Sequence, residues 1–406
     1  MPDVIVIGAR CAGATTAMLL ARRGYEVLLV DRNTFPSDIP RGHFVHMHGP
    51  PLLAKWGLLG RVIASGAPPI TKQTLDFGDF PLSADNLSVN GVPFGIAPRR
   101  TELDEILVEE AVASGAELRE GFAVQDFIQD GPRIAGVVGR SAVSGALVRE
   151  RASIVIGADG RNSALARRVA APIYEYAPPL NCWYWSYWSG FEGDALEVTV
   201  RDRRAIYGFP TNDGLYALSI AWPLEELPRV KADIEGEFEK VVRAMPGFGE
   251  RLSGATREER FYGATQMPHF MRRPYGAGWA LVGDAGAHKD PVLALGICDA
   301  LRDAELLAGA IDDGLSRRVP MRDAMEGYER RRNNATLPLY HTNLQAASFG
   351  PRPERETALR AALRDYPEDT RQFFLAREGL ISQQEFFSEA NLARIFERAA
   401  RRPLAA

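Results

Sequence analysis

The sequence predicts an α/β protein in which a parallel sheet is joined to an antiparallel sheet and the chain ends in helices. Three observations support this fold class. The chain opens with a strand, helix and strand over residues 4–31, aliphatic runs that end in glycine turns recur in ASIVIGADGRNS and GWALVGDAGAHKDP, and residues 171–267 contain alternating aromatic segments. Continuous aliphatic runs are typical of parallel strands buried on both faces, and alternation is typical of antiparallel sheets.

Composition narrows the class of protein. The chain has 406 residues, a length that allows it to bury a large core. Its residues are 46% apolar and 25% charged, which is close to the average of globular proteins. A net charge of −4 gives no reason to expect nucleic acid as a partner. The first strand begins close to Met1 and no stretch approaches the apolar length of a spanning helix, so we expect neither a secretion signal nor a membrane span.

The cysteines indicate the redox setting. The three cysteines, Cys11, Cys182 and Cys298, lie in different segments and none belongs to a C-x-x-C pair. This distribution supports neither a disulfide framework nor a thiolate zinc site. A reducing, cytoplasmic setting therefore fits best.

The opening segment predicts a βαβ unit that binds a dinucleotide. Gly8 and Gly13 keep the first and third positions of the usual G-x-G-x-x-G loop, while Arg10 stands at the second. The helix that begins near Ala12 still offers its free amides to a diphosphate, and the Arg10 guanidinium can lie beside the phosphates. Asp31 supplies a carboxylate for ribose hydroxyls and disfavours a 2′-phosphate, so FAD or NAD is expected rather than NADP. The alternative is a degenerate glycine turn that opens an ordinary βαβ unit.

Two further turns identify a family. Asp159 in GADGRNS and Asp284 in GDAGAHKDP each follow an aliphatic strand. With these turns, the chain resembles the FAD-dependent oxidoreductases related to p-hydroxybenzoate hydroxylase, the aromatic-ring hydroxylase type of flavoprotein monooxygenase. The opening loop, RRTELDEIL, GADGRNS, FPTNDG and GDAGAHKDP follow that family's order and spacing. The resemblance implies a Rossmann-like FAD-binding fold of the glutathione reductase type, with an inserted antiparallel-sheet substrate domain and a helical C-terminus.

The predicted domains are discontinuous along the chain. We expect an FAD-binding domain that comprises residues 1–75, 98–170 and 268–345. A substrate-binding β-sheet domain is expected over residues 76–97 and 171–267, and a C-terminal helical segment over residues 346–406. We also expect the strand ends near residues 8, 159 and 284 to meet at one extended flavin nucleotide.

The resemblance implies a set of contacts with FAD. Gly8, Ala12 and Gly13 would contact the diphosphate with Arg10 beside them, Asp31 and Arg32 would contact the adenosine end, and the backbone of Val124 would contact the adenine. Arg100 would contact the ribityl or phosphate part, and Asp284 would bind a ribityl hydroxyl. The turn from Pro291 to Ile297 would lie beneath the flavin ring. Helix-start amides near Gly296 and Ile297 can stabilise negative charge at the flavin N1/O2 locus. Asp159 either belongs to this site or only holds an Asx turn.

The chain also departs from the family. Beyond Arg10, Leu293 or Ala294 stands where a glycine is expected, and Cys298 stands where asparagine is often found. His288 lies one place later than usual. These changes leave open whether oxygen is activated as in the hydroxylases, whereas FAD binding is still expected.

The segment RGHFVHMHG contributes candidates for substrate contact. His43, His46 and His48 lie in a loop that faces the flavin and substrate in this family, and their spacing matches no common zinc motif. Loop packing or substrate contact is therefore favoured over a metal, and no metal is expected. Arg41 either orients an anionic substrate or the nicotinamide cofactor, or is a solvated loop charge.

The aromatic segment CWYWSYWSGF predicts one strand with two distinct faces. Trp183, Trp185 and Tyr187 share one face, and Tyr184 and Trp188 lie on the other. One face either lines an apolar substrate pocket or simply packs within the sheet.

The function implied by the resemblance is an FAD-dependent monooxygenase. Such an enzyme would use NAD(P)H and O2 to hydroxylate or epoxidise an apolar or aromatic small molecule through a flavin C4a-peroxide. NAD(P)H would be a transient reductant without its own domain. No side chain need act as a nucleophile. The substrate, the choice of NADH or NADPH, and the oligomeric state, monomer or homodimer, are not readable from the chain.

Three alternatives remain open at this stage. One is an FAD-dependent reductase or dehydrogenase of the geranylgeranyl-reductase type, and another is a flavin-containing non-redox protein that binds or cyclises a ligand. A flavin halogenase is less favoured, because the chain has no W-x-W-x-I-P segment and no lysine in a comparable place near the flavin.

Overall fold

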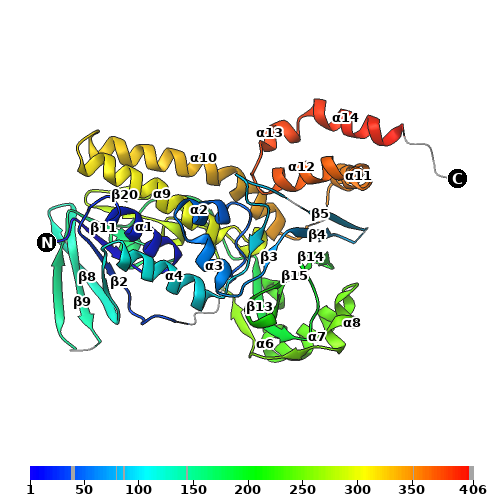
Figure 1. Ribbon diagram of the computed structural model, residues 1–406, viewed down its shortest axis with the longest axis horizontal. Coiled ribbons are helices and arrows are strands. Elements are labelled where there is room, and N and C mark those ends of the chain that lie inside the picture. The colour runs from blue at the N-terminus through cyan, green and yellow to red at the C-terminus, as the bar shows by residue number, and fades with distance from the viewer. Residues whose placement is uncertain (38–41, 79, 86, 143–144, 351, 402–406) are drawn as a thin grey trace.

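A computed structural model describes residues 1–37, 42–78, 80–85, 87–142, 145–350 and 352–401. Figure 1 shows one body built on two large sheets, with the long helices α9 and α10 along one side and the last helices near the C-terminus. The predicted fold class is confirmed: the chain combines an α/β FAD-binding fold, further antiparallel sheets and a helical C-terminal part.

The first sheet has six strands in the order β20-β21-β11-β1-β2-β7. The β20–β21 pair is antiparallel and the other pairs are parallel. Each central strand is a short, fully buried aliphatic run, as the sequence predicted. The strands are β1 (Val4–Ile7), β2 (Val27–Val30), β7 (Glu117–Arg119), β11 (Ile154–Gly157), β20 (Tyr275–Gly276) and β21 (Trp279–Leu281).

Both faces of this sheet are covered. Val4 and Val6 of β1 belong to a core shared with helices, and Ile5 and Ile7 belong to a second core that includes the strands β8 and β9. The period of two along β1 therefore sends alternate side chains into two different layers. The covering elements are α1 (Cys11–Ala21), α4 (Arg100–Ala113) and α9 (Gly296–Leu315) on one face, and β8 (Phe122–Asp130), β9 (Arg133–Ser141), β10 (Leu147–Arg151) and α5 (Ala164–Arg168) on the other.

The second large sheet follows the order β17-β13-β16-β15-β14-β4-β5, and β18 also pairs with β13. Its strands are β4 (Lys72–Asp76), β5 (Pro81–Asp85), β13 (Asn181–Ser189), β14 (Ala195–Arg201), β15 (Arg204–Pro210), β16 (Tyr216–Pro223), β17 (Thr256–Arg257) and β18 (Tyr262–Ala264). Strand β4 shows that this sheet takes in residues from 72 onward. The division of the chain into domains remains a proposal.

The two faces of β13 carry the aromatic side chains as predicted. Trp183, Trp185 and Tyr187 pack in a core shared with the C-terminal helices, whereas Tyr184 and Trp188 pack in a core beneath three other helices. Those three helices are α6 (Leu227–Ala232), α7 (Ile234–Ala244) and α8 (Phe248–Ser253). The prediction of two distinct faces is thus confirmed.

Smaller elements connect the layers. They are α2 (Gly49–Lys55), α3 (Leu59–Ala64), β3 (Pro69–Ile70), β6 (Gly95–Ile96), β12 (Ile173–Ala177), β19 (His269–Arg272), β22 (Ala287–His288) and the short 3₁₀ helices η1 (Asn212–Gly214), η2 (Leu224–Glu226), η3 (Gly283–Ala285) and η4 (Pro291–Leu293). The last two lie in the chain between β21 and α9, and η4 belongs to the turn from Pro291 to Ile297 that is expected beneath the flavin ring.

The C-terminal part packs against the second sheet. Leu392 and Ile395 are buried in the same core as Trp183, so the last helix docks on its own protein. The helices of this part are α10 (Met321–Ala347), α11 (Glu354–Leu363), α12 (Pro367–Arg377), α13 (Gln383–Phe386) and α14 (Glu389–Ala400). Across the described ranges, the helices are too short or too polar for a bilayer crossing.

Candidate functional site: a dinucleotide cradle beside an apolar cavity

Three strand ends lie side by side at one edge of the first sheet. Ile7, Gly157 and Leu281 are in register across β1, β11 and β21. The backbone continues this alignment, because Ala158 N–H donates to the Ile7 carbonyl and Val282 N–H donates to the Gly157 carbonyl, at 2.8 and 3.0 Å. Open α/β sheets bind ligands at this carboxyl edge.

The turn after β1 is closely packed against its neighbours. Gly8 has φ +99°, and a Cβ there would lie 2.6 Å from the carbonyl oxygen of Ala158. A Cβ on Gly13 would lie 1.7 Å from the Gly8 carbonyl oxygen. Only glycine permits both the positive φ and these approaches. Helix α1 therefore begins directly against the strand ends, as a dinucleotide cradle requires.

The start of α1 retains free donors, although Arg10 precedes it. The first backbone bond of the helix runs from Ala14 N–H to the Arg10 carbonyl, so the three preceding amides have no partner within the helix. The Arg10 guanidinium is engaged with two side chains: it donates to Asp104 at 2.6 Å and to Ser37 at 3.0 Å. The arginine is therefore held by its own neighbours and leaves the helix-start amides available.

Asp31 lies at the end of β2, where a ribose-binding carboxylate is expected. Its Oδ2 accepts from Ala9 N–H at 2.8 Å and its Oδ1 accepts from Asn33 N–H at 2.8 Å. The Asp31 carbonyl accepts from Phe122 N–H at the start of β8, which places Val124 two residues along a strand anchored at Asp31. Arg32 is exposed.

A buried charge cluster joins α1 to the start of α4. Arg100 forms a two-pronged ion pair with Asp104, with N–O distances of 2.6 and 2.8 Å, and the same carboxylate binds Arg10. Burial alone would lower the pKa of Arg100, but the carboxylates of Asp104 and Asp284 raise it above its usual range. Arg100 and Asp284, which the sequence assigned to the same part of the cofactor, therefore act on one another electrostatically.

Asp159 holds the turn after β11. Its Oδ2 accepts from Ala164 N–H, the first residue of α5, at 2.7 Å. Burial raises the pKa of this carboxyl group, against the effect of its hydrogen bonds. This geometry is that of a side chain that caps a turn, the structural role considered for it.

The turn expected beneath the flavin ring contains a left-handed residue. Ala294 has φ +52°, the conformation that glycine favours, and it follows η4 directly. Ala294 is one of the two positions, with Leu293, where the resemblance implied a glycine, and it holds this backbone shape at a cost of about 1–2 kcal/mol. Helix α9 then starts at Gly296, followed by the buried Ile297.

Asp290 fixes this turn to the second sheet. Its buried carboxylate accepts from Trp183 Nε1–H at 3.2 Å and from Asn181 Nδ2–H at 3.3 Å, and also from Val292 N–H at 3.0 Å. Burial raises the pKa of Asp290 to about 6, although these hydrogen bonds oppose the rise. The turn and strand β13 therefore form one hydrogen-bonded unit.

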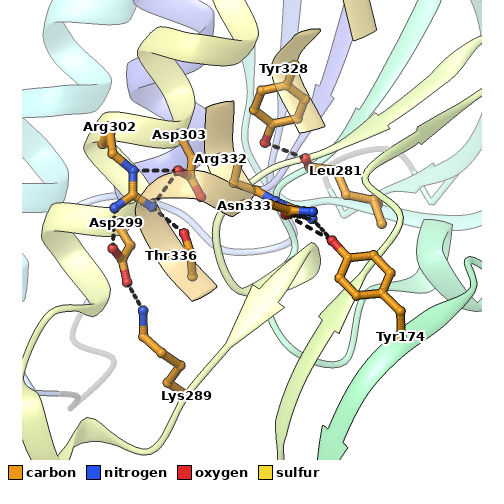
Figure 2. A network of polar contacts seen from close by, with 10 residues as sticks. All are labelled: Tyr174, Leu281, Lys289, Asp299, Arg302, Asp303, Tyr328, Arg332, Asn333 and Thr336. Atoms are coloured by element: carbon orange, nitrogen blue, oxygen red, sulfur yellow. Dashed lines mark hydrogen bonds and ion pairs between the residues drawn. The ribbon is translucent and has the colours of Figure 1, made fainter. Parts of the chain in front are cut away.

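A network of polar contacts ties the same turn to α9 and α10 (Figure 2). Lys289 pairs with Asp299, and Arg302 bridges Asp299 and Asp303, each at 2.7 Å, and reaches Thr336 of α10 at 2.8 Å. Burial opposes ionisation of Asp299, but Lys289 and Arg302 lower its pKa to about 2. In the same view, Tyr328 of α10 donates to the Leu281 carbonyl at 3.0 Å, which anchors β21.

The three candidate histidines have different surroundings. His43 is buried beside Tyr187 and Phe209, and burial, together with the nearby Arg99, lowers its pKa to about 3. His46 Nδ1 lies 3.2 Å from the Glu378 carboxylate. Burial lowers the pKa of His48. The described residues contain no cluster of three or more metal-ligating side chains, and Arg41 lies outside them.

A cavity of about 70 Å³ lies between the second sheet, the turn at 291–295 and helix α12. Its wall is mostly apolar, with side chains from β4, β14 and β15 on one side and Val292, Leu293 and Leu295 on another. A water needs about 10–15 Å³ by such a measure, so the cavity has room for an organic group. His46 is the predicted candidate that lies on this wall.

Three charged cavity residues, Arg352, Arg377 and Glu378, were missed by the sequence reasoning. Arg377 and Glu378 lie at the end of α12, more than 300 residues beyond the opening loop. The signal that was present is the pair of opposite charges that directly follows the apolar run of FFLAREG. Sequence spacing alone does not connect that pair to the turn at 291–295.

FAD fits the residues present. Gly8 and Gly13 let the helix start come close to the strand ends, where a Cβ would clash with neighbouring backbone atoms. The helix-start amides suit a diphosphate, and the Asp31 carboxylate suits ribose hydroxyls. The bulk of the Arg10 side chain does not disturb this arrangement, because its guanidinium is bound to Asp104 and Ser37.

Comparison with known proteins supports this interpretation. The FAD binding domain family matches residues 1–207. A tryptophan 2-halogenase of Chondromyces crocatus is 28% identical over 336 residues, and the match spans 80% of this chain and 64% of the halogenase's own length. Digeranylgeranylglycerophospholipid reductase 2 of Methanothermobacter thermautotrophicus is 28% identical over 77% of this chain and 79% of its own length.

A solved structure shares the fold. The protein described as "pqsL, a probable FAD-dependent monooxygenase from Pseudomonas aeruginosa" aligns with a TM-score of 0.71 at 22% identity, over 93% of this chain and 99% of that one. The family match over half of the chain, the shared fold and the cradle geometry agree. The chain therefore belongs to the FAD-dependent aromatic hydroxylase-like family of flavoenzymes, and its cofactor is FAD.

Proposed function

We propose that the protein is an FAD-dependent monooxygenase that uses NAD(P)H and O2 to hydroxylate or epoxidise an apolar or aromatic small molecule. The observation that carries this proposal is the position of the cavity: Val292, Leu293 and Leu295 belong both to its wall and to the turn expected beneath the flavin ring. A substrate in this cavity would therefore lie next to the reactive end of the cofactor.

The residues of the chain have separate roles in this proposal. Gly8, Ala12 and Gly13 hold the diphosphate, Asp31 the ribose, and the cluster of Arg100 and Asp284 the ribityl part. Asp159 supports these contacts by holding its turn. When bound, FAD supplies the redox chemistry with oxygen.

The second module positions the substrate and excludes water. The aliphatic and aromatic wall gives a dry environment, as flavin-dependent oxygen transfer requires. Helix α9 starts at Gly296, and the amides near Gly296 and Ile297 would stabilise the negative charge that develops on the reduced cofactor, because a helix start favours such charge. Tyr207 donates to the Val292 carbonyl and thereby ties the cavity wall to the turn.

The proposed function is tested by oxygen consumption. The holoenzyme should consume O2 and NADH or NADPH in equal amounts when a substrate is oxygenated, and product formed under ¹⁸O2 should gain one labelled atom. Reduction of the flavin by dithionite is the control that the cofactor is intact. A flavin that dithionite reduces but neither nicotinamide reduces, with every substrate offered, would contradict the proposal and favour a non-redox role.

A halogenase is the second candidate, because a tryptophan 2-halogenase is among the relatives over most of this chain. The described cavity wall contains no lysine, and Lys289 is engaged in an ion pair with Asp299. This arrangement favours oxygen transfer to the substrate itself. Chloride or bromide added to the reduced enzyme with O2 would produce a halogenated product if this second candidate is correct.

A reductase of the geranylgeranyl-reductase type is the remaining redox alternative, supported by the archaeal relative. Such an enzyme would reduce an alkene under strictly anaerobic conditions. Oxygen dependence of product formation therefore separates this activity from the proposed one.

A further inference from the structure

The charged groups on the cavity wall are unequally paired. His46 faces Glu378 at 3.2 Å, and Arg352 is hydrogen-bonded to Glu356 in the first turn of α11. Arg377 also lines the cavity, yet within the part of the chain that the structure describes it forms no ion pair. One guanidinium on a mostly apolar wall is thus left over after the others are matched.

Aromatic rings partly compensate the Arg377 charge. Its guanidinium carbon lies 5.7 Å from the centre of the Phe77 ring and 5.8 Å from that of Phe373. The Arg352 guanidinium carbon also lies over the Phe77 ring, 3.2 Å from its centre. Cation–π contacts at these distances stabilise a guanidinium less than a paired carboxylate does.

The surroundings disfavour the charged form of Arg377. Burial lowers the pKa of Arg377 and the neighbouring Arg352 lowers it further, while the Glu356 carboxylate opposes the shift without reversing it. An arginine does not lose its proton under these conditions, so the cost persists as an unmet attraction for an anion. A bound carboxylate would satisfy it with a bidentate pair.

We propose that this cavity binds a carboxylic acid with an aromatic or other apolar body, and that Arg377 pairs with its carboxylate. The body would lie along Phe77, Leu75 and Val292 and so extend toward the turn expected beneath the flavin ring. A monoanion fits better than a phosphate, because Glu378 adjoins Arg377 and would repel a second negative charge. The inference rests on the proposed function, in that it names the substrate class of the same cavity.

The inference is tested by binding alone, with the holoenzyme. Benzoate, 2-naphthoate and indole-3-acetate are compared with their neutral amides, benzamide, 2-naphthamide and indole-3-acetamide, by equilibrium dialysis and by the change in flavin absorbance. A charge-assisted pair contributes about 1.5–3 kcal/mol, so at least one carboxylate should bind about 10–100-fold more tightly than its amide. The inference is overturned if no carboxylate binds more tightly than its amide.

Variants assign the effect to one residue. In Arg377→Gln, the preference for the carboxylate should fall to near one, while the affinity for the amide stays unchanged; in Arg377→Lys, part of the preference should remain. Arg364→Gln is the matched control, since Arg364 lies over Phe80 near the same helices but outside the cavity wall. A preference that survives Arg377→Gln, or one that disappears in Arg364→Gln, would refute the assignment.

The two proposals fail in different ways. A carboxylate that binds through Arg377 but is never oxygenated contradicts the proposed function and leaves this inference intact. If neutral compounds are oxygenated and no carboxylate binds more tightly than its amide, the proposed function is supported and this inference is contradicted. If Arg377→Gln loses its FAD, the carboxylate-to-amide ratio of Arg377→Lys against the unaltered protein provides the same test.

Discussion

The dinucleotide cradle and the cavity region are built in opposite ways. The cradle consists of residues 8–13 with Asp31, and its shape depends on backbone atoms that approach so closely that Gly8 and Gly13 leave no room for a Cβ. The cavity region consists of the cavity wall and the loop at 42–48, and it depends on side chains such as His46 and Glu378 that come from distant segments. Under the proposed function, nucleotide binding therefore relies on main-chain geometry, whereas substrate choice relies on side-chain placement.

The largest effect is expected in the cradle. Gly13→Ala would place a methyl group 1.7 Å from the Gly8 carbonyl oxygen, so helix α1 must move away from the strand ends. We expect loss of bound FAD, measured as flavin absorbance per folded protein after a circular dichroism check. Gly309→Ala in α9 is the control, because a Cβ there meets nothing and alanine favours a helix. Full FAD occupancy in Gly13→Ala would show that the cradle is not backbone-defined.

The next largest effect is expected when the contact between His46 and Glu378 in the cavity region is broken, and it concerns the free energy of unfolding. Burial alone would raise the pKa of the Glu378 carboxyl group. The nearby His46 opposes this effect, so the pKa of Glu378 is lowered overall. Glu378→Gln removes the charge that faces His46, and we expect a loss of about 2 kcal/mol in unfolding free energy at pH 7, measured by urea denaturation. Glu239→Gln, which breaks the exposed pair with Arg243, should cost about 0.5 kcal/mol or less. Equal losses would remove the distinction between a buried and a surface pair.

A pH dependence should also distinguish the cavity region. Burial lowers the pKa of His43 to about 3 from 6.5, so the folded protein resists protonation that the unfolded chain accepts. The stabilisation is fully present above pH 6.5 and falls as the pH falls toward the folded pKa, by about 2 kcal/mol between pH 6.5 and 5. Urea denaturation at pH 7 and pH 5 should show a smaller loss in His43→Gln. The same loss in both proteins would mean that His43 does not titrate as a buried group.

The smallest effect is expected for Arg10 within the cradle. Arg10→Gly restores the usual glycine, and because the guanidinium is already bound to Asp104 and Ser37, the dissociation constant for FAD should change by about threefold or less. Titration of apoprotein with FAD measures this change. A loss of affinity greater than about thirtyfold would show that the Arg10 side chain contacts the phosphates after all.

Much of the fold was predictable because it depends on local rules. The aliphatic strands, the helix after Gly8 and the two faces of the aromatic strand at 183–188 all follow from periodicity. The sequence showed Leu293 or Ala294 where the resemblance implied a glycine. The structure shows that Ala294 takes the left-handed backbone conformation.

The candidate site was predictable only in part. Asp31, Arg100 and Asp284 carry signals because each stands at a fixed offset from a strand or helix end. The contact of His46 with Glu378 carries none, because more than 300 residues separate the two side chains. The engagement of Arg10 with Asp104 and Ser37 was likewise not foreseen from the loop.

The sequence by itself determined the cofactor and the fold class, because close backbone approach and positive φ demand glycine at set spacings and leave a readable pattern. Only the tertiary structure decided which charges meet at the cavity. Arg377 and Phe77 are far apart in the chain, and their meeting depends on how α12 packs against the second sheet. Packing of this kind is satisfied by many sequences and therefore leaves no fixed spacing to read.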